Sequence, residues 1–224
     1  MVSLKTSYWI RGAAVLIPAL LILLLVSAST APAWQAEAAW VPDGDTFILE
    51  DRRVIRLQGI DAPETGQGQE KDQYFALESA RRLESLIMDR QLDIRPAHQG
   101  QDRFKRTLAT VYAGGGESVN FKMIRQGYAF YYPHKDLSEE LAEKLLRAQR
   151  QAMQQRLGFW PVILELEPAP VLYGNLKSKR FHVPGCRYGQ RMAESNKVEF
   201  SSLFQAFFKG YAPCRKCTPW PAAR

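Results

Sequence analysis

The sequence predicts an α+β fold, mainly β, in which short strands form a small closed barrel with helices packed on it. The strand-like segments are short and do not alternate regularly with helices, which argues against a doubly wound sheet. Two segments carry apolar residues at helical spacing. The 224 residues are 46% hydrophobic and 24% charged, a composition typical of a globular protein with real cores.

Residues 1–33 have the layout of a secretory signal peptide. Two basic residues precede an apolar run over residues 13–26, and small residues follow, ending in Ala31-Pro32-Ala33. This run is short for a membrane span of about 20 residues. We therefore expect export with cleavage after Ala28 or Ala33, and a secreted or periplasmic protein. An uncleaved membrane anchor is the alternative.

The strands of the barrel are expected where β-branched and aromatic residues gather between turn signals. Glu50-Asp51-Arg52 is a polar turn between the first two strands, and Gly114-Gly115-Gly116 ends a later one. The expected strands cover residues 41–49, 53–60, 91–96 and 107–112, and residues 128–132 are expected to return as a strand or an extended edge.

Three segments are expected to be helical. From Ala76, apolar residues recur at i, i+4, i+7 and i+11, so residues 73–89 form an amphipathic helix. Residues 119–125 form a short second helix. Glu139 follows Asp136 by three residues, a capping-box pattern that places Asp136 at the start of a third helix, which ends before Gly158.

The chain is expected to divide into a barrel domain over residues 34–164, a proline-rich linker over residues 165–170 and a small domain over residues 171–224. Charge supports the division. The net charge of the whole chain is +7, but residues 168–224 hold 10 Lys and Arg against 2 Asp and Glu. A strongly basic module suggests a polyanion partner such as nucleic acid, although solubility or bound thiolates could also account for the charge.

Four residues of the C-terminal segment have the spacing of a metal site. His182-x3-Cys186 and Cys214-x2-Cys217 are two ligand pairs suited to tetrahedral zinc. An odd number of cysteines does not suit a pure disulfide framework. A Cys214–Cys217 disulfide with Cys186 free remains an alternative in an oxidising compartment.

A second group of residues has the chemistry needed to hydrolyse a phosphodiester. Asp45 and Asp61 are hard oxygen donors suited to Ca²⁺ or Mg²⁺. Glu64 lies three residues after Asp61, where a carboxylate can accept a proton from water. Arg56 offers a planar guanidinium that can grip two phosphate oxygens.

Three ordered motifs resemble the staphylococcal (micrococcal) nuclease family. They are Asp43-Gly44-Asp45-Thr46, Arg56-Leu-Gln-Gly-Ile-Asp-Ala-Pro-Glu64 and Asp102-Arg-Phe-Lys-Arg-Thr-Leu-Ala-Thr-Val-Tyr112, and the match covers residues 36–160. The resemblance implies a five-stranded OB-fold barrel with three helices. It also implies a Ca²⁺-dependent endonuclease that cuts DNA and RNA and leaves 3′-phosphate ends.

The same resemblance implies the metal ligands. Asp45 and Asp61 would bind calcium together with the backbone carbonyl of Ala62, and Asp43 would be the supporting carboxylate beside the ion.

The resemblance also implies the catalytic residues. Glu64 would be the general base, or the residue that orients the attacking water, and Arg56 and Arg106 would neutralise charge in the transition state. Phe104 and Lys105 stand where the best-known member has tyrosine and glycine, and phenylalanine can still stack on a base. The expected nucleic-acid contacts in this segment are Arg103, Phe104 and Lys105.

The C-terminal segment resembles the metal-binding domain of bacterial methylphosphotriester DNA repair proteins. The matching residues are Asn175-Leu-Lys-Ser-Lys-Arg-Phe-His182 with Cys186, and Phe200-Ser-Ser with Gly210-Tyr-Ala-Pro-Cys-Arg-Lys-Cys217. The resemblance favours zinc as a structural ion. His182 stands where that family has its methyl-accepting cysteine, so repair chemistry is not expected. Lys179 and Arg180 are expected to contact nucleic acid.

Two functions compete for this sequence. One is a secreted nuclease, expected to be a monomer without a stable protein partner, that takes DNA and RNA as substrates. The other is a non-catalytic nucleic-acid-binding protein on a nuclease-like scaffold, which would be expected to lack some of the catalytic residues. All five are present, Asp45, Arg56, Asp61, Glu64 and Arg106, so the sequence favours the enzyme. A metal-sensing or redox protein would leave the barrel unexplained.

Overall fold

The computed structural model describes residues 32–66, 68–218 and 220–223. The expected signal peptide, residues 1–33, lies almost wholly outside these residues. Among the described residues, no helix is both long enough and apolar enough to cross a bilayer.

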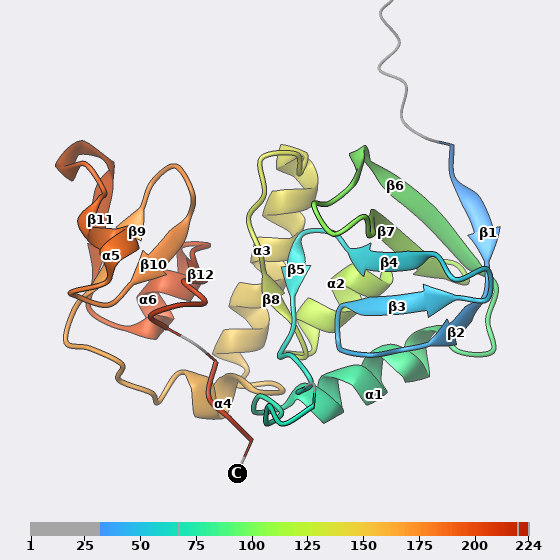
Figure 1. Ribbon diagram of the computed structural model, residues 1–224, viewed down its shortest axis with the longest axis horizontal. Coiled ribbons are helices and arrows are strands. Elements are labelled where there is room, and N and C mark those ends of the chain that lie inside the picture. The colour runs from blue at the N-terminus through green and yellow to red at the C-terminus, as the bar shows by residue number, and fades with distance from the viewer. Residues whose placement is uncertain (1–31, 67, 219, 224) are drawn as a thin grey trace, which may run out of the picture.

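One curved sheet forms the barrel, with strand order β1-β6-β7-β4-β3-β2 (Figure 1). The strands are β1 (Trp34–Ala36), β2 (Ala38–Trp40), β3 (Thr46–Leu49), β4 (Val54–Leu57), β6 (Leu92–Gln101) and β7 (Thr107–Ala113). All pairs are antiparallel except β4 with β7. Only Glu37 separates β1 from β2, yet the two lie at opposite ends of the strand order. The sheet must therefore curl back on itself, with β1 and β2 acting as one bent strand of a five-stranded OB-fold barrel.

Three helices accompany the barrel, as the sequence predicts. They are α1 (Ala76–Ile87), α2 (Val119–Arg125) and α3 (Glu139–Gln154). Strand β5 (Ile60–Asp61) pairs with β8 (Phe130–Tyr131) outside the main sheet. The stripe on α1 is shifted from the expected one, because Ser79 rather than Ala80 is fully buried and donates its hydroxyl to the carbonyl of Tyr128.

The start of α3 differs from the sequence prediction. Ser138, not Asp136, is the N-cap, and its hydroxyl accepts the backbone N–H of Leu141. Asp136 instead pairs with His134, whose Nδ1 lies 2.8 Å from its carboxylate. A hydroxyl at the N-cap is as effective as a carboxylate, so the sequence offered two valid caps two residues apart.

The C-terminal part is a second small α+β unit. A four-stranded sheet has the order β11-β9-β10-β12, and its members are β9 (Leu172–Asn175), β10 (Arg180–His182), β11 (Lys197–Phe200) and β12 (Ala212–Pro213). The helical segments that follow α3 are α4 (Trp160–Ile163), α5 (Arg187–Gln190), η1 (Glu194–Asn196) and α6 (Leu203–Phe208).

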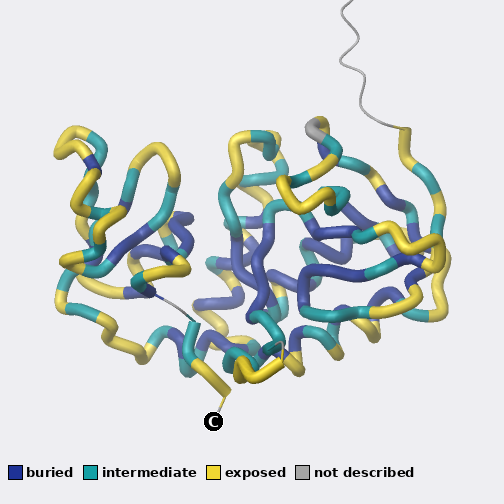
Figure 2. Tube along the Cα trace, in the orientation of Figure 1, coloured by how far each residue is buried: buried dark blue, intermediate teal, exposed yellow. Residues whose placement is uncertain are grey.

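The barrel and the C-terminal part share a buried hydrophobic cluster. Figure 2 shows buried segments of the chain in both parts. Phe207 of α6 makes edge contacts with Phe130 of β8, with Trp160 of α4 and with Phe181 of β10. Gln149 of α3 is fully buried and donates its amide to the carbonyl of Phe207 at 2.7 Å. Helix α3 therefore carries core residues on two sides, and residues 165–170 join two units that are packed together.

Phe207→Ala tests this shared core. Removing a fully buried phenylalanine costs about 3–5 kcal/mol of unfolding free energy, and the loss is expected for the whole chain because Phe207 contacts both parts. Urea denaturation followed by tryptophan fluorescence measures it. Phe204→Ala on the same helix is the control, since Phe204 is 38% exposed. Equal losses of unfolding free energy in the two variants would contradict the shared core. A barrel whose unfolding is unchanged in Phe207→Ala would contradict it as well.

Candidate active site

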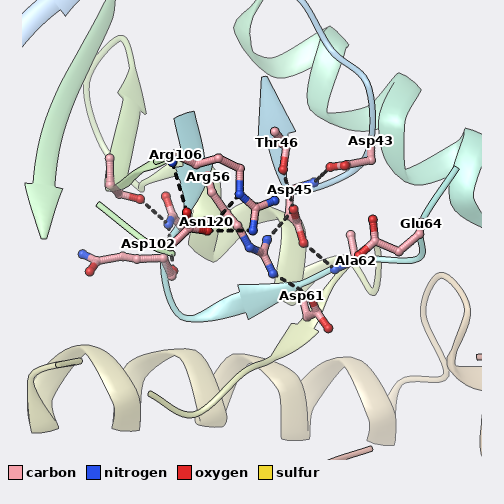
Figure 3. A network of polar contacts seen from close by, with 12 residues as sticks. Asp43, Asp45, Thr46, Arg56, Asp61, Ala62, Glu64, Asp102, Arg106 and Asn120 are labelled. Atoms are coloured by element: carbon pink, nitrogen blue, oxygen red, sulfur yellow. Dashed lines mark hydrogen bonds and ion pairs between the residues drawn. The ribbon is translucent and has the colours of Figure 1, made fainter. Parts of the chain in front are cut away.

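The loop before β3 aims Asp45 into the site. Gly44 is needed here because a Cβ would lie 2.5 Å from the Cβ of Ser79 and 2.8 Å from that of Ala62. Glycine at this position therefore permits close packing of the loop against α1 and against the segment after β5. Asp43 also fixes this loop, because its carboxylate accepts the backbone N–H of Asp45 at 3.0 Å (Figure 3).

Arg56 lies buried between two carboxylates. Cross-strand pairing sets Thr46 of β3 opposite Arg56 of β4, which brings the neighbouring Asp45 to the guanidinium. Nη1 of Arg56 pairs with Asp45, and Nη2 lies 2.5 Å from Oδ1 of Asp61. The side chains of these three residues are 4 to 9% exposed. Asp45 also accepts the Thr46 hydroxyl at 2.9 Å and the Ala62 N–H at 3.0 Å.

The segment after β5 carries Glu64. Its backbone N–H donates to the side-chain oxygen of Gln73 at 2.9 Å, and its carbonyl accepts the N–H of Gln73 at 3.0 Å. These two bonds hold the backbone in place and leave the half-buried carboxylate free to face the cluster. The structure thus brings Asp43, Asp45, Arg56, Asp61 and Glu64 together.

The negative charges of the carboxylates in this cluster repel one another. Burial, with the charge of Asp45, raises the pKa of Asp43 to about 8. Burial also raises the pKa of Asp61 and of Glu64, and in both the charge of Asp45 adds to the effect. Burial alone would raise the pKa of Asp45 too, but Arg56 and the hydrogen bond from Ala62 lower it.

The donor chemistry of this cluster suits a divalent cation. Four carboxylates face only one buried guanidinium, so negative charge is left uncompensated. All the donors are oxygens, the set that Ca²⁺ and Mg²⁺ prefer. Asp45, Asp61 and the carbonyl of Ala62 would hold the ion, with Asp43 beside it.

Arg106 lies on the wall of the same pocket as Arg56. The pocket has a volume of about 430 Å³ and also includes Asp102, Phe104 and Tyr132. Both Nε and Nη2 of Arg106 bind the Asp102 carboxylate, at 2.9 and 2.8 Å. Among the described residues, no hydrogen bond or ion pair joins Arg106 to the carboxylate cluster, and its guanidinium is held by Asp102 instead.

The loop over residues 102–106 presents an exposed aromatic ring. Phe104 is 62% exposed, and the guanidinium of Arg103 lies 4.6 Å from the centre of its ring. Lys105 has a φ of 64°, in the left-handed region that favours glycine. This explains in physical terms why glycine suits the position. The exposed ring and the basic side chains fit the expected contact with nucleic acid.

One residue of the site was not predicted. Arg215, from the C-terminal part, places Nη2 2.6 Å from Oδ1 of Asp61 and 3.3 Å from Oε1 of Glu64. The sequence marks Arg215 only as one of several basic residues near the cysteines. His134 also lines the pocket and pairs with Asp136.

The predicted zinc ligands lie together. The ligand atoms of His182, Cys186, Cys214 and Cys217 all lie within 4.8 Å of one another, and none of the cysteines is in a disulfide. Nδ1 of His182 is 3.4 Å from Sγ of Cys186 and 3.7 Å from Sγ of Cys217. Tetrahedral zinc, with bonds of about 2.0–2.3 Å, requires ligand atoms roughly 3.5–3.8 Å apart. The two nitrogen–sulfur separations are close to these values, and the four residues together could hold a metal ion.

The two basic residues at the start of β10, Lys179 just before the strand and Arg180 within it, have partners within the fold. Arg180 lies 3.8 Å above the ring of Tyr132 and donates to the carbonyl of Pro133 at 3.4 Å. Lys179 lies against Tyr211, with Nζ 4.8 Å from the ring centre. Both are half-buried. Arg180 therefore lies where the C-terminal part meets the wall of the pocket.

Buried carboxylates and guanidiniums at one face of an OB-fold barrel define a metal-dependent phosphodiesterase, and the comparisons with known proteins agree. Residues 54–162 match the family described as "Staphylococcal nuclease homologue". The chain is 32% identical over 154 residues to an "Uncharacterized endonuclease" of Haemophilus influenzae, covering 67% of this chain and 79% of that protein. It belongs to the staphylococcal nuclease family.

Two further relatives carry names of the same kind. A "Micrococcal nuclease" of Shigella flexneri is 31% identical over 153 residues, covering 62% of this chain and 80% of the relative. A "Thermonuclease" of Staphylococcus hyicus is 29% identical over 126 residues, covering 54% and 72%. The chain is therefore a nuclease with nucleic acid as its substrate class.

Asp43→Asn tests the charge of the cluster. With a pKa near 8 against an ordinary 3.8, folded Asp43 keeps a proton that the unfolded chain releases. The free energy of unfolding of the wild type should therefore fall between about pH 5 and pH 8 in chelator, whereas the variant lacks this contribution. Urea denaturation at both pH values measures the difference.

Calcium provides the control for this experiment. A bound cation favours the ionised carboxylate, so Ca²⁺ at the higher pH should remove the advantage of the Asp43→Asn variant. Parallel pH dependences of the two proteins in chelator would show that Asp43 is ionised throughout.

Proposed function

We propose that this protein is an exported, Ca²⁺-dependent nuclease that hydrolyses DNA and RNA to 3′-phosphate ends, with a structural zinc ion in its C-terminal part. The observation that carries the catalytic proposal is the buried Asp45–Arg56–Asp61 group with Glu64 beside it. The exposed ring of Phe104 and the basic residues of the same loop support contact with nucleic acid.

Each residue would make a separate contribution to hydrolysis. A divalent ion held by Asp45 and Asp61 would neutralise charge on the phosphate. Glu64 would take the proton from the attacking water, and burial together with the charges of Asp45 and Asp61 raises its pKa, which makes it a stronger base. Arg56 is held rigid by its two carboxylates, so its remaining N–H groups would meet a phosphate oxygen without reorganisation. Arg106, which lines the same pocket as Arg56, would bind the same phosphate.

Glu64→Gln tests the assignment of the base. The variant cannot accept a proton, so the rate of cleavage should fall at least about a hundredfold. Binding of a short oligonucleotide in Ca²⁺ should change little, because the proposed ligands Asp45 and Asp61 remain. Plasmid digestion and fluorescence anisotropy measure the two quantities.

Glu70→Gln is the matched control for this variant. Glu70 lies in the same loop and is exposed, so the substitution removes the same charge without touching the cluster. Cleavage by Glu64→Gln at the rate of the control would exclude Glu64 as the base. Binding without cleavage by the wild type, in Ca²⁺ and in Mg²⁺, would favour the non-catalytic alternative.

Zinc is proposed because of the donor set and because the four ligand atoms lie close together, all within 4.8 Å of one another. Three sulfur atoms and one imidazole nitrogen suit a closed structural site. The ion would join β10, which carries His182, to the turn that follows β12 and carries Cys214 and Cys217. These short elements have few core residues of their own, and a metal is a common substitute for a core in so small a unit.

Cys186→Ser distinguishes zinc from the disulfide alternative. If zinc is bound, the variant loses metal and its melting temperature falls, because one of four ligands is gone. If Cys214 and Cys217 form a disulfide, Cys186 is a free thiol and its replacement changes little. Metal content by mass spectrometry, thiol titration and thermal melting decide between the two. A metal-free wild type with one titratable thiol would overturn the zinc proposal.

A further inference from the structure

The guanidinium of Arg215 reaches the carboxylate cluster from the C-terminal part of the chain. Its Nη2 is 2.6 Å from Oδ1 of Asp61, the oxygen that also binds Arg56 at 2.5 Å. Two guanidiniums from segments more than 150 residues apart thus meet at one oxygen. Arg215 also lines the pocket that contains Arg56 and Arg106.

The position of Arg215 is fixed by the backbone on both sides of it. Cys214 donates its N–H to the carbonyl of Phe181 at 3.0 Å, and its own carbonyl accepts the N–H of Cys217 at 3.2 Å and that of Thr218 at 2.9 Å. Beyond the turn, Trp220 stacks on Phe130 with ring centres 5.1 Å apart. Arg215 therefore stands at the tip of a tight turn that is anchored against the barrel.

An ion pair made only for docking does not explain this arrangement. The Arg215 side chain is 57% exposed, and exposed ion pairs add little to stability. The two parts are already joined by the core around Phe207 and by the buried amide of Gln149. The Arg215 side chain is instead placed at the open side of the cluster, where a phosphate would enter.

Resting on the nuclease function proposed above, we propose that Arg215 is a third phosphate-binding guanidinium of the active site, supplied by the C-terminal part. With a cation held at Asp61, Arg215 would be repelled from that carboxylate and attracted to an anionic phosphate beside it. The exposed side chain has room to move between these two partners. The C-terminal part then completes the substrate site of the barrel.

The test compares Arg215→Ala with Lys216→Ala. Both remove one positive charge from the same exposed turn, and Lys216 forms no ion pair with any described residue. Initial rates on a single-stranded oligonucleotide in Ca²⁺ give kcat/KM. Losing a charge-assisted contact to the phosphate should lower kcat/KM roughly ten- to a hundredfold for Arg215→Ala relative to Lys216→Ala. Arg215→Lys, which keeps the charge but not the fork, should fall between the two.

A binding measurement separates this proposal from the proposed function. A phosphorothioate oligonucleotide keeps the backbone charge and resists hydrolysis, so its affinity in Ca²⁺ reports on the contact alone. Arg215→Ala should weaken its binding more than Lys216→Ala does. Calcium titration without nucleic acid should show equal or tighter binding in Arg215→Ala, because a competing cation has been removed.

The outcomes are distinct. If the wild type binds the oligonucleotide but cleaves nothing, the nuclease assignment fails, and the affinity measurement still decides the role of Arg215. Equal kcat/KM and equal affinity in the two alanine variants would overturn the proposal. Faster cleavage by Arg215→Ala than by the wild type would also overturn it, and would make Arg215 an inhibitory counter-ion of Asp61 and Glu64.

Discussion

The burial of Arg56 between Asp45 and Asp61 constrains the rest of this structure. A buried charge is tolerated only when it is paired and hydrogen-bonded, and here the pairing depends on strand register. Thr46 lies opposite Arg56, so Asp45 reaches the guanidinium from the loop before β3. A slip of one residue would turn Arg56 to the other face of the sheet. The site and the barrel are therefore specified by the same contacts, and the site retains more negative than positive charge.

Much of this site could be predicted from the sequence, because its residues lie close together in the chain and on two hydrogen-bonded strands. The span from Asp43 to Glu64 holds every member of the carboxylate cluster. The helix over residues 119–125 was also predicted correctly, since Ser118 and Gly127 mark its ends. Local signals were less decisive where two residues offered the same signal. At the start of α3, Ser138 and Asp136 are both competent N-caps, so the sequence alone did not identify the residue that caps the helix.

The packing of the C-terminal part could not be read from the sequence. A proline-rich stretch predicts a spacer, and the apolar residues of α6 could equally have formed a core of their own. In the structure, Phe207 packs between aromatic rings from both sides of that stretch. Arg215 was missed for the same reason, because its contact with Asp61 depends on docking between distant segments and on no local pattern.

The uneven charge of the chain takes on a different meaning once the two parts are packed together. As separate domains, a barrel of net charge −3 over residues 34–167 and a basic tail of +8 over residues 168–224 would have independent partners. Packed together, the tail brings Arg180 to the pocket wall and Arg215 to the carboxylate cluster. A cluster rich in carboxylates attracts a divalent cation but repels a polyanion. Basic residues from a second part of the chain can offset that repulsion without being buried in the barrel, where each would need a partner of its own as Arg56 does.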